Sequence, residues 1–195
     1  MIHKSAIRRK TKETDILLKL KIEGSGRYDI SSPIGFFNHM LETLARHSSF
    51  DIVAKIKGDI EVDQHHIVED TGLCLGLALN KALGEKKGIN RAGFFIHPMD
   101  ETLAMVAIDI SGRSFLKYSG SFKNQKVGDF FIDTIEDFFV GFTNGCPCTL
   151  HIKLISGRSD HHKVEAIFKA FARALSQACV IDKRIKDVIS TKGLL

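Results

Sequence analysis

The sequence contains no tryptophan, only three prolines and two tyrosines, and no long hydrophobic run. No apolar stretch approaches the ~18 residues that a membrane-spanning helix requires. The first residues, MIHKSAIRRKTKETD, lack the apolar segment of a secretion signal. We therefore expect a cytoplasmic protein that has no membrane partner.

Cysteine is also scarce, and its spacing excludes the common cysteine-based sites. The four cysteines lie at positions 74, 146, 148 and 179 and do not form the paired spacing of a zinc ribbon. A chain of this size without a secretion signal gives no reason to expect disulfides. We interpret the cysteines as inert thiols of the core.

What the chain does contain is typical of an ordered globular protein. Its 195 residues are 44% hydrophobic and 26% charged, which is enough apolar material for a substantial core. The formal net charge is +5 and the pI is about 9.0. A positive charge favours an anionic partner, either a nucleic acid or a small phosphorylated molecule, and the charge alone does not distinguish the two.

The pattern of the first half predicts strands and helices in turn. Residues 11–23 alternate, with Ile16, Leu18, Leu20 and Ile22 on one face, and predict a half-buried strand of an opening strand pair. Helical spacing of apolar residues follows within 31–48 and again within 65–84, and residues 50–62 between them are typical of a strand.

The second half repeats this plan around a duplicated motif. DQHHIVED at 63–70 returns ninety-six residues later as SDHHKVEA at 159–166. Residues 91–113 and 114–122 predict two strands, 133–145 a helix, 148–155 a strand and 161–179 a helix. We therefore predict an internally duplicated α+β fold whose similar halves, residues 1–92 and 93–195, pack as one body with a short C-terminal tail.

The duplicated motif has the chemistry of a metal centre. On a helix, two adjacent histidines diverge by about 100°, while a glutamate three or four positions later lies near both. Imidazole and carboxylate ligands in such numbers suit manganese, iron or zinc, with manganese favoured by ligand hardness, and one helical turn can serve two nearby ions. The predicted ligands are His65, His66, Glu69, His161, His162 and Glu165.

Aligning the two halves adds two further ligand candidates. His39 lies 26 residues before its histidine pair, and Asp137 lies 24 residues before the second pair, in the corresponding predicted helix. An isolated histidine or aspartate on a helix is usually solvated or hydrogen-bonded. We interpret His47 and His151 as such ordinary residues. The alignment of the two halves favours a ligand role for His39 and Asp137.

The ordered set of motifs closely resembles the imidazoleglycerol-phosphate dehydratase family. The resemblance runs from about residue 5 to the end of the chain and departs from the family pattern at Asn38, Ser114 and Asp137, where the family usually has aspartate, proline and a metal-binding histidine. It is carried by RKTKET (9–14), FFNHMLETLARH (36–47), HHIVEDTGLCLGLAL (65–79), GINRAG (88–93), PMDETL (98–103), SGR (111–113), HHKVEAIFKAFARAL (161–175) and STKG (190–193).

The resemblance implies a fold, a reaction and an assembly. Each half would be a mixed four-stranded sheet backed by helices. The enzyme would dehydrate D-erythro-imidazole glycerol phosphate to imidazole acetol phosphate in histidine biosynthesis. The family uses an imidazolate intermediate on two manganese ions and forms homo-oligomers, typically of 24 subunits, with sites at subunit interfaces.

The resemblance also implies roles for residues outside the metal set. Glu13 of RKTKET would be the general acid/base. Cationic and hydroxyl side chains would hold the substrate phosphate, namely Arg91, Arg113, Lys169, Ser190 and Lys192.

Two other functions are weighed against this one. A dimetal phosphate-ester hydrolase would use its ions to activate water, but it favours a bridging carboxylate and more aspartate ligands than this histidine-rich set provides. A nucleic-acid-binding module would need aromatic platforms or a basic stripe. Here the cations are dispersed and most of the 14 phenylalanines have core-like spacing, so we expect no nucleic-acid partner.

Overall fold

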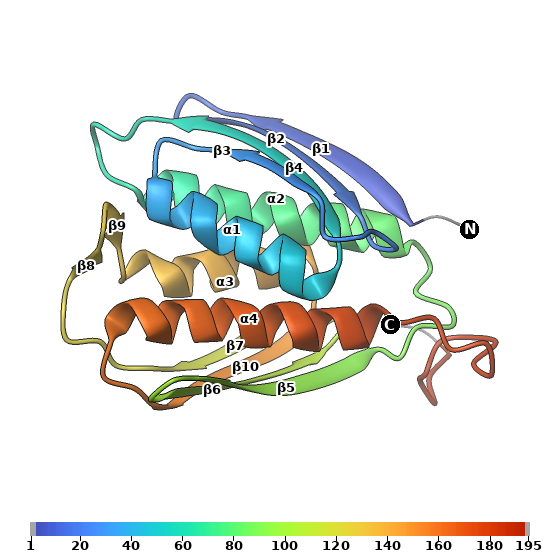
Figure 1. Cartoon of the computed structure of the whole chain (residues 1–195). Coiled ribbons are helices and arrows are strands. Elements are labelled where there is room, and N and C mark those ends of the chain that lie inside the picture. Colours follow the sequence, from blue (N-terminus) through green and yellow to red (C-terminus); the bar gives the residue numbers. More distant parts are fainter. Residues whose placement is uncertain (1–2, 194–195) are drawn as a thin grey trace.

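The computed structural model describes residues 3–193, and within them two sheets enclose two layers of helices (Figure 1). Helices α1 (Gly35–Ser48) and α2 (His65–Leu83) cover the inner face of one sheet. Helices α3 (Thr134–Gly145) and α4 (Asp160–Cys179) cover the inner face of the other. None of these helices is both long and apolar enough to cross a membrane.

The first sheet has the strand order β1-β2-β4-β3. It consists of β1 (Lys4–Lys10), β2 (Thr14–Lys21), β3 (Tyr28–Ser31) and β4 (Asp51–Gly58). The pairs β1–β2 and β2–β4 are antiparallel, whereas β3 and β4, which are connected through α1, are parallel. The inward-facing Ile16, Leu18, Leu20 and Ile22 are buried as their alternation predicts.

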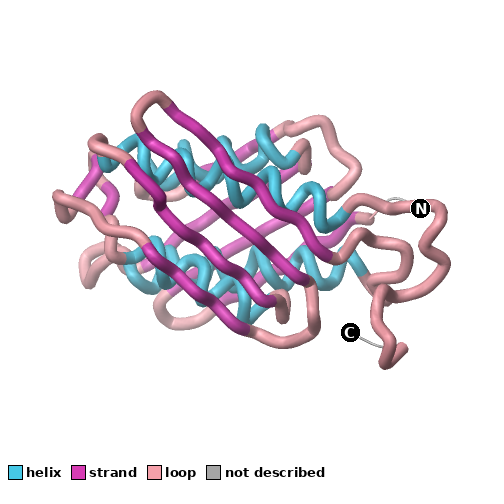
Figure 2. The backbone as a smooth tube through the Cα atoms, turned by 90° about the horizontal axis from the view of Figure 1, so that it is seen from below, coloured by secondary structure: helices cyan, strands magenta, loops and turns pink. Residues whose placement is uncertain are grey.

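The second sheet repeats that order as β5-β6-β10-β7. It consists of β5 (Ala92–Met99), β6 (Thr102–Asp109), β7 (Phe115–Ser119) and β10 (Thr149–Ser156). Its last pair, β7 and β10, is again parallel. A small hairpin of β8 (Lys126–Val127) and β9 (Phe130–Phe131) precedes α3. The predicted duplicated α+β fold with two mixed four-stranded sheets is confirmed, and Figure 2 shows the second sheet in front.

Three predicted strands are wrong in extent, two of them because a hairpin turn lies within the predicted range. Residues 91–113 form the two antiparallel strands β5 and β6 and not one strand. Residues 11–13 form the turn before β2, so Glu13 lies at a hairpin turn and not within a strand. The expected strand at 50–62 ends at Gly58.

The core between the helices is rich in phenylalanine side chains that are excluded from solvent. Phe37, Phe138, Phe142, Phe168 and Phe171 are completely buried. The four cysteines are buried as free thiols, as predicted, and burial raises the pKa of the Cys74 thiol to about 11.

Glycines bring α2 and α3 into backbone contact. A Cβ atom added to Gly72 would lie 2.0 Å from the carbonyl oxygen of Phe138, and one added to Gly141 would lie 2.3 Å from that of Glu69. Gly76 and Gly145 lie one turn further along the helices, and a Cβ atom added to either would likewise clash with the backbone of the facing helix. Because only glycine permits so close an approach, the residues around these positions on the two helices lie next to one another.

All four helices begin at the same end of the molecule, which the colour gradient in Figure 1 makes visible. At each helix start a carboxylate accepts backbone N–H groups, which compensates the positive end of the helix dipole. Asp129 accepts from Gly35 and Phe36, Asp63 from His65, Asp133 from Thr134, and Glu101 from Arg158 and Ser159. The predicted metal ligands lie at this end.

Candidate metal centre and active site

One group of predicted ligands lies on α2 and α3. His65 Nε2 is 3.4 Å from Glu69 Oε2 on the same helix, and His65 Nδ1 is 3.1 Å from Asp137 Oδ2 on α3. The three side chains are partly exposed, and His65 and Asp137 line a hollow of about 240 Å³. The structure therefore brings Asp137 to the histidine motif of the other half. Asp137 faces Nδ1 of the His65 ring, whereas Glu69 faces Nε2.

A second group lies on α1 and α4. His39, His161 and Glu165 each offer one ligand atom, and these atoms all lie within 4.8 Å of one another. Burial by itself raises the pKa of Glu165, but the hydrogen bond from Lys169 and the nearby positive charges outweigh it and hold the pKa below its ordinary value. Nitrogen and oxygen donors at this spacing fit a divalent ion such as manganese, iron or zinc.

Each group combines residues from both halves of the chain. Asp137 from the second half joins His65 and Glu69 from the first, while His39 from the first half joins His161 and Glu165 from the second. This crosswise arrangement follows from the packing of α2 against α3 and of α1 against α4. Neither half alone supplies all three residues of either of these two groups.

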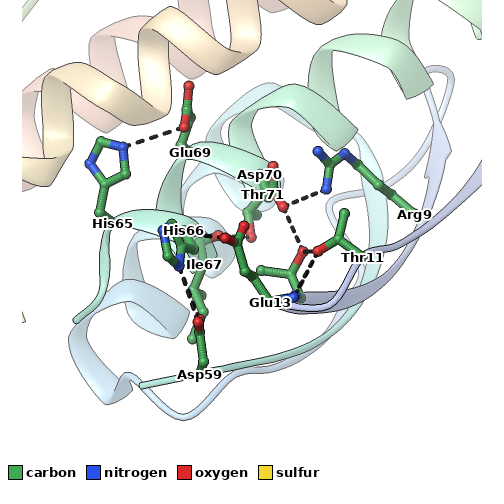
Figure 3. Close-up of polar contacts among 11 residues, drawn as sticks. Arg9, Thr11, Glu13, Asp59, His65, His66, Ile67, Glu69, Asp70 and Thr71 are labelled. Carbon is green, nitrogen blue, oxygen red and sulfur yellow. Dashed lines mark hydrogen bonds and ion pairs between the residues drawn. The ribbon is translucent and has the colours of Figure 1, made fainter. Parts of the chain in front are cut away.

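The two other histidines predicted as ligands, His66 and His162, contact other carboxylates. His66 Nδ1 lies 3.2 Å from both carboxylate oxygens of Asp59, and His162 Nδ1 lies 2.9 Å from Glu101 Oε2. The hydrogen bond to Asp59 raises the pKa of His66, and backbone N–H groups and His162 hold the pKa of Glu101 far below its ordinary range. In Figure 3, His65 and His66 diverge from the start of α2, as their helical positions require.

Glu13 is held at its hairpin turn by a compact polar network (Figure 3). The backbone N–H groups of Glu13 and Thr14 donate to Thr11 Oγ1 at 3.1 and 2.9 Å. Asp70, next to Glu69 on α2, accepts from the Thr14 hydroxyl at 2.5 Å and from Arg9 at 2.6 Å. The Glu13 side chain itself is exposed and its Oε1 lies 3.9 Å from His66 Nε2. The RKTKET motif thus fixes the backbone of Glu13 and leaves its carboxylate accessible.

The predicted phosphate-binding residues are only partly gathered. Arg91 donates to both oxygens of Asp109 and to the carbonyl oxygen of Ile189, which places it against the C-terminal segment that holds Ser190 and Lys192. Lys169 instead lies 2.9 Å from Glu165. Arg113 is exposed in the loop just before β7.

Sequence reasoning missed several polar residues of this region. Asp59 and Glu101 were not predicted, although Glu101-Thr102 occupies the same place in its hairpin as Glu13-Thr14, and this repeat was a usable signal. His47, which was interpreted as ordinary, lies beside His97 near Lys169, with the two ring centroids 5.8 Å apart. A hollow of about 700 Å³ on the first sheet contains none of the predicted site residues.

Comparison with known proteins assigns the chain to one family. The model of the family described as imidazoleglycerol-phosphate dehydratase matches residues 32–175. The imidazoleglycerol-phosphate dehydratase of Koribacter versatilis is 52% identical over 195 residues, covering all of both chains. That of Clostridium acetobutylicum is 50% identical over 187 residues, covering 96% of this chain and 95% of the relative.

Solved structures agree with the sequence relatives. The Staphylococcus aureus imidazoleglycerol-phosphate dehydratase superposes with a TM-score of 0.82 at 36% identity, covering 93% of this chain and all of that one. The Pyrococcus furiosus enzyme gives 0.85 at 35% identity and covers 97% of this chain and all of that one. The chain therefore belongs to the imidazoleglycerol-phosphate dehydratase family and is a hydro-lyase of histidine biosynthesis.

Proposed function

We propose that this chain dehydrates D-erythro-imidazole glycerol phosphate to imidazole acetol phosphate at a site that holds two manganese ions. The observation that carries the proposal is the pair of ligand groups, His65–Glu69–Asp137 and His39–His161–Glu165, at one end of the molecule. When bound, the two ions would hold the substrate ring as imidazolate, whose electrons can expel the hydroxyl group.

Glu13 would act as the general acid/base for this elimination. Its carboxylate is exposed beside His66, while its backbone is fixed by Thr11. A base must reach the carbon-bound proton of a substrate whose ring lies on the ligands, and the position of Glu13 next to a motif histidine supports that geometry. A fixed backbone with a free carboxylate is suited to proton transfer without loss of alignment.

The phosphate would be held by Arg91, Arg113, Lys169, Ser190 and Lys192. Support comes from the contact of Arg91 with the carbonyl oxygen of Ile189, which keeps one of these cations next to the segment that carries Ser190 and Lys192. A guanidinium fork, ammonium groups and a hydroxyl together suit a phosphate dianion. The net charge of +5 is consistent with an anionic substrate.

The active enzyme would be a homo-oligomer, which by resemblance has 24 subunits. Each ligand group supplies only three side chains, whereas manganese commonly takes six ligands, and His66 and His162 point away from both groups toward their own carboxylates. The outer face of the second sheet exposes Phe94, Ile96 and Phe115 by 70%, 49% and 53%. An apolar sheet face of this kind supports contact with another copy.

The test measures dehydration by metal-stripped protein with and without Mn(II), beside Glu13→Gln and the neighbouring control Asp15→Asn. Asp15 lies on the same hairpin, paired with Arg8, and takes no part in the proposed chemistry. We expect manganese-dependent turnover that falls about 10²–10⁴-fold in Glu13→Gln and is unchanged in the control. Bound manganese without dehydration, accompanied by phosphate release from phosphate esters, would support the hydrolase instead.

A further inference from the structure

The second histidine of each motif meets a carboxylate through the same ring nitrogen. Both carboxylate oxygens of Asp59 lie 3.2 Å from His66 Nδ1, and Glu101 Oε2 lies 2.9 Å from His162 Nδ1. The first histidines differ, because His65 and His161 turn Nε2 toward the glutamate four positions later. The two halves therefore share one arrangement of rings, although their carboxylates come from different loops.

We propose that Asp59 and Glu101 are positioning residues that fix the tautomer and orientation of His66 and His162, so that Nε2 of each ring can bind metal. An ionised carboxylate only accepts hydrogen bonds, so Nδ1 must carry a proton, and in the neutral ring the lone pair then lies on Nε2. Such a carboxylate also makes the ring a stronger ligand. The inference rests on the proposed metal site and adds two residues to it.

The two carboxylate oxygens of Glu101 accept hydrogen bonds from different partners. Oε1 accepts the backbone N–H groups of Arg158 and Ser159 at 3.1 and 2.7 Å, just before α4 begins, while Oε2 meets His162. The hairpin turn between β5 and β6 is thus tied both to the start of α4 and to the ring that α4 carries. The corresponding position of the first half holds Glu13, whose exposed carboxylate lies 3.9 Å from His66 Nε2.

Asp59 performs the orienting task for the first half and links it to Glu13. Its backbone N–H donates to the carbonyl oxygen of Glu13 at 3.1 Å, while its carboxylate contacts the His66 ring. His66 Nε2 is thereby directed toward the side on which Glu13 lies. Each second histidine thus receives an acceptor from a turn that is also anchored to the backbone.

A direct ligand role is the competing interpretation for Glu101. Asp100, Glu101 and His162 each offer a ligand atom within 4.8 Å of the others, a spacing that a metal ion could use. However, both oxygens of Glu101 already accept hydrogen bonds, from two backbone N–H groups and from the ring. These contacts favour positioning over ligation.

Glu101→Gln separates the orienting role from the structural one. The amide oxygen can still accept the N–H groups of Arg158 and Ser159, so the helix start is preserved. The amide NH₂ group, however, donates to Nδ1 of His162, which moves the ring proton to Nε2 and removes the ligating lone pair. Within the described residues, both oxygens of Asp59 contact only the His66 ring, so an amide could still turn its oxygen to Nδ1, and the matching variant there is Asp59→Ala, which removes the acceptor.

The experiment titrates Mn(II) into the metal-stripped full-length protein and follows free manganese by electron paramagnetic resonance. The control is Glu23→Gln, which alters a carboxylate on Nδ1 of His3, outside the site. We expect two ions per subunit in the parent protein and in the control. In Glu101→Gln and Asp59→Ala, the affinity for at least one ion should fall roughly 10–100-fold.

A second readout does not need metal. Ring nitrogen NMR of the metal-free parent should show His66 and His162 protonated at Nδ1, and Glu101→Gln should show the opposite tautomer at His162. Unchanged manganese affinity in both variants, or Nδ1 without a proton in the parent, would overturn the inference, as would an ion bound among Asp100, Glu101 and His162. A parent that binds manganese but does not dehydrate the substrate would count against the proposed function alone.

Discussion

Asp137 is the residue at which this chain departs most from the chemistry that the resemblance implies. A carboxylate is a harder, anionic ligand, whereas the histidine usual at this position is a neutral nitrogen donor. In the structure Asp137 Oδ2 lies 3.1 Å from His65 Nδ1 and so reaches the metal group through a contact that a shorter or apolar residue would lose.

Exchanging this ligand type should change metal selectivity. In Asp137→His we expect affinity to shift toward zinc relative to manganese, by about tenfold, because imidazole favours later and softer ions. The measurement is competition between Mn(II) and Zn(II) for the metal-stripped protein. Glu136→His is the control, since it adds a histidine to the exposed face of the same turn. An equal shift in both variants would show that the position of residue 137 is not what matters.

At this scale the sequence predicts residue types better than contacts. The HHxxE spacing on a helix is sufficient to nominate His65 and Glu69, and the alignment of the halves nominates Asp137, which the structure places 3.1 Å from His65. Asp59 and Glu101 were not predicted because they lie on turns, where the direction of a side chain depends on strand pairing that local patterns do not reveal. The binding of metal by any of these residues stays a prediction.

At the scale of elements, the contact between α2 and α3 determines where the first ligand group lies. Gly72 on one helix and Gly141 on the other face the backbone of the partner helix, with no side chain between. Glu69 and Asp137 lie within one turn of these contacts. The direct contact between the two helix backbones therefore determines how far apart the residues of this group lie.

Gly141→Ala should break this contact. The added methyl group would lie 2.3 Å from the carbonyl oxygen of Glu69, so the helices must separate, and we expect a loss of about 2 kcal/mol in the free energy of unfolding. Alanine's better helix propensity offsets only part of this. Denaturant unfolding measures the change, with the exposed Asn144→Ala on the same helix as control. Equal stability in the two variants would show that the helices tolerate separation.

Strands and helices were predicted well where periodicity is long and less well at turns. The predicted helices within 31–48, at 65–84, 133–145 and 161–179 contain all four observed ones apart from a residue at an end. The β5–β6 hairpin was missed because its turn at Asp100-Glu101 contains no glycine or asparagine and the alternation continues on both sides. Asp100 adopts a positive φ of 48° there, a conformation that aspartate tolerates better than most residues but that it signals less strongly than glycine does.

At the scale of the whole molecule, the exposed outer face of the second sheet predicts how copies meet. Phe94, at 70% exposure, is the most exposed of the large apolar residues on this face. Phe94→Lys should weaken assembly and give smaller species in size-exclusion chromatography with light scattering, because a desolvated charge opposes an apolar contact. Val180→Lys, an exposed apolar position after α4, is the control. An unchanged mass for Phe94→Lys would place the interface elsewhere.

The common direction of the four helices gives each chain a permanent electric dipole along its length. At about 3.5 debye per peptide unit, the helices together contribute on the order of 200 debye, reduced by the carboxylates at their starts. A single chain would therefore align in an electric field. In a closed assembly whose subunits are related by intersecting rotation axes the subunit vectors cancel, so the proposed 24-mer would show no net orientation. Helix direction thus gives the single chain its dipole, and the symmetry of the assembly would remove the electric birefringence.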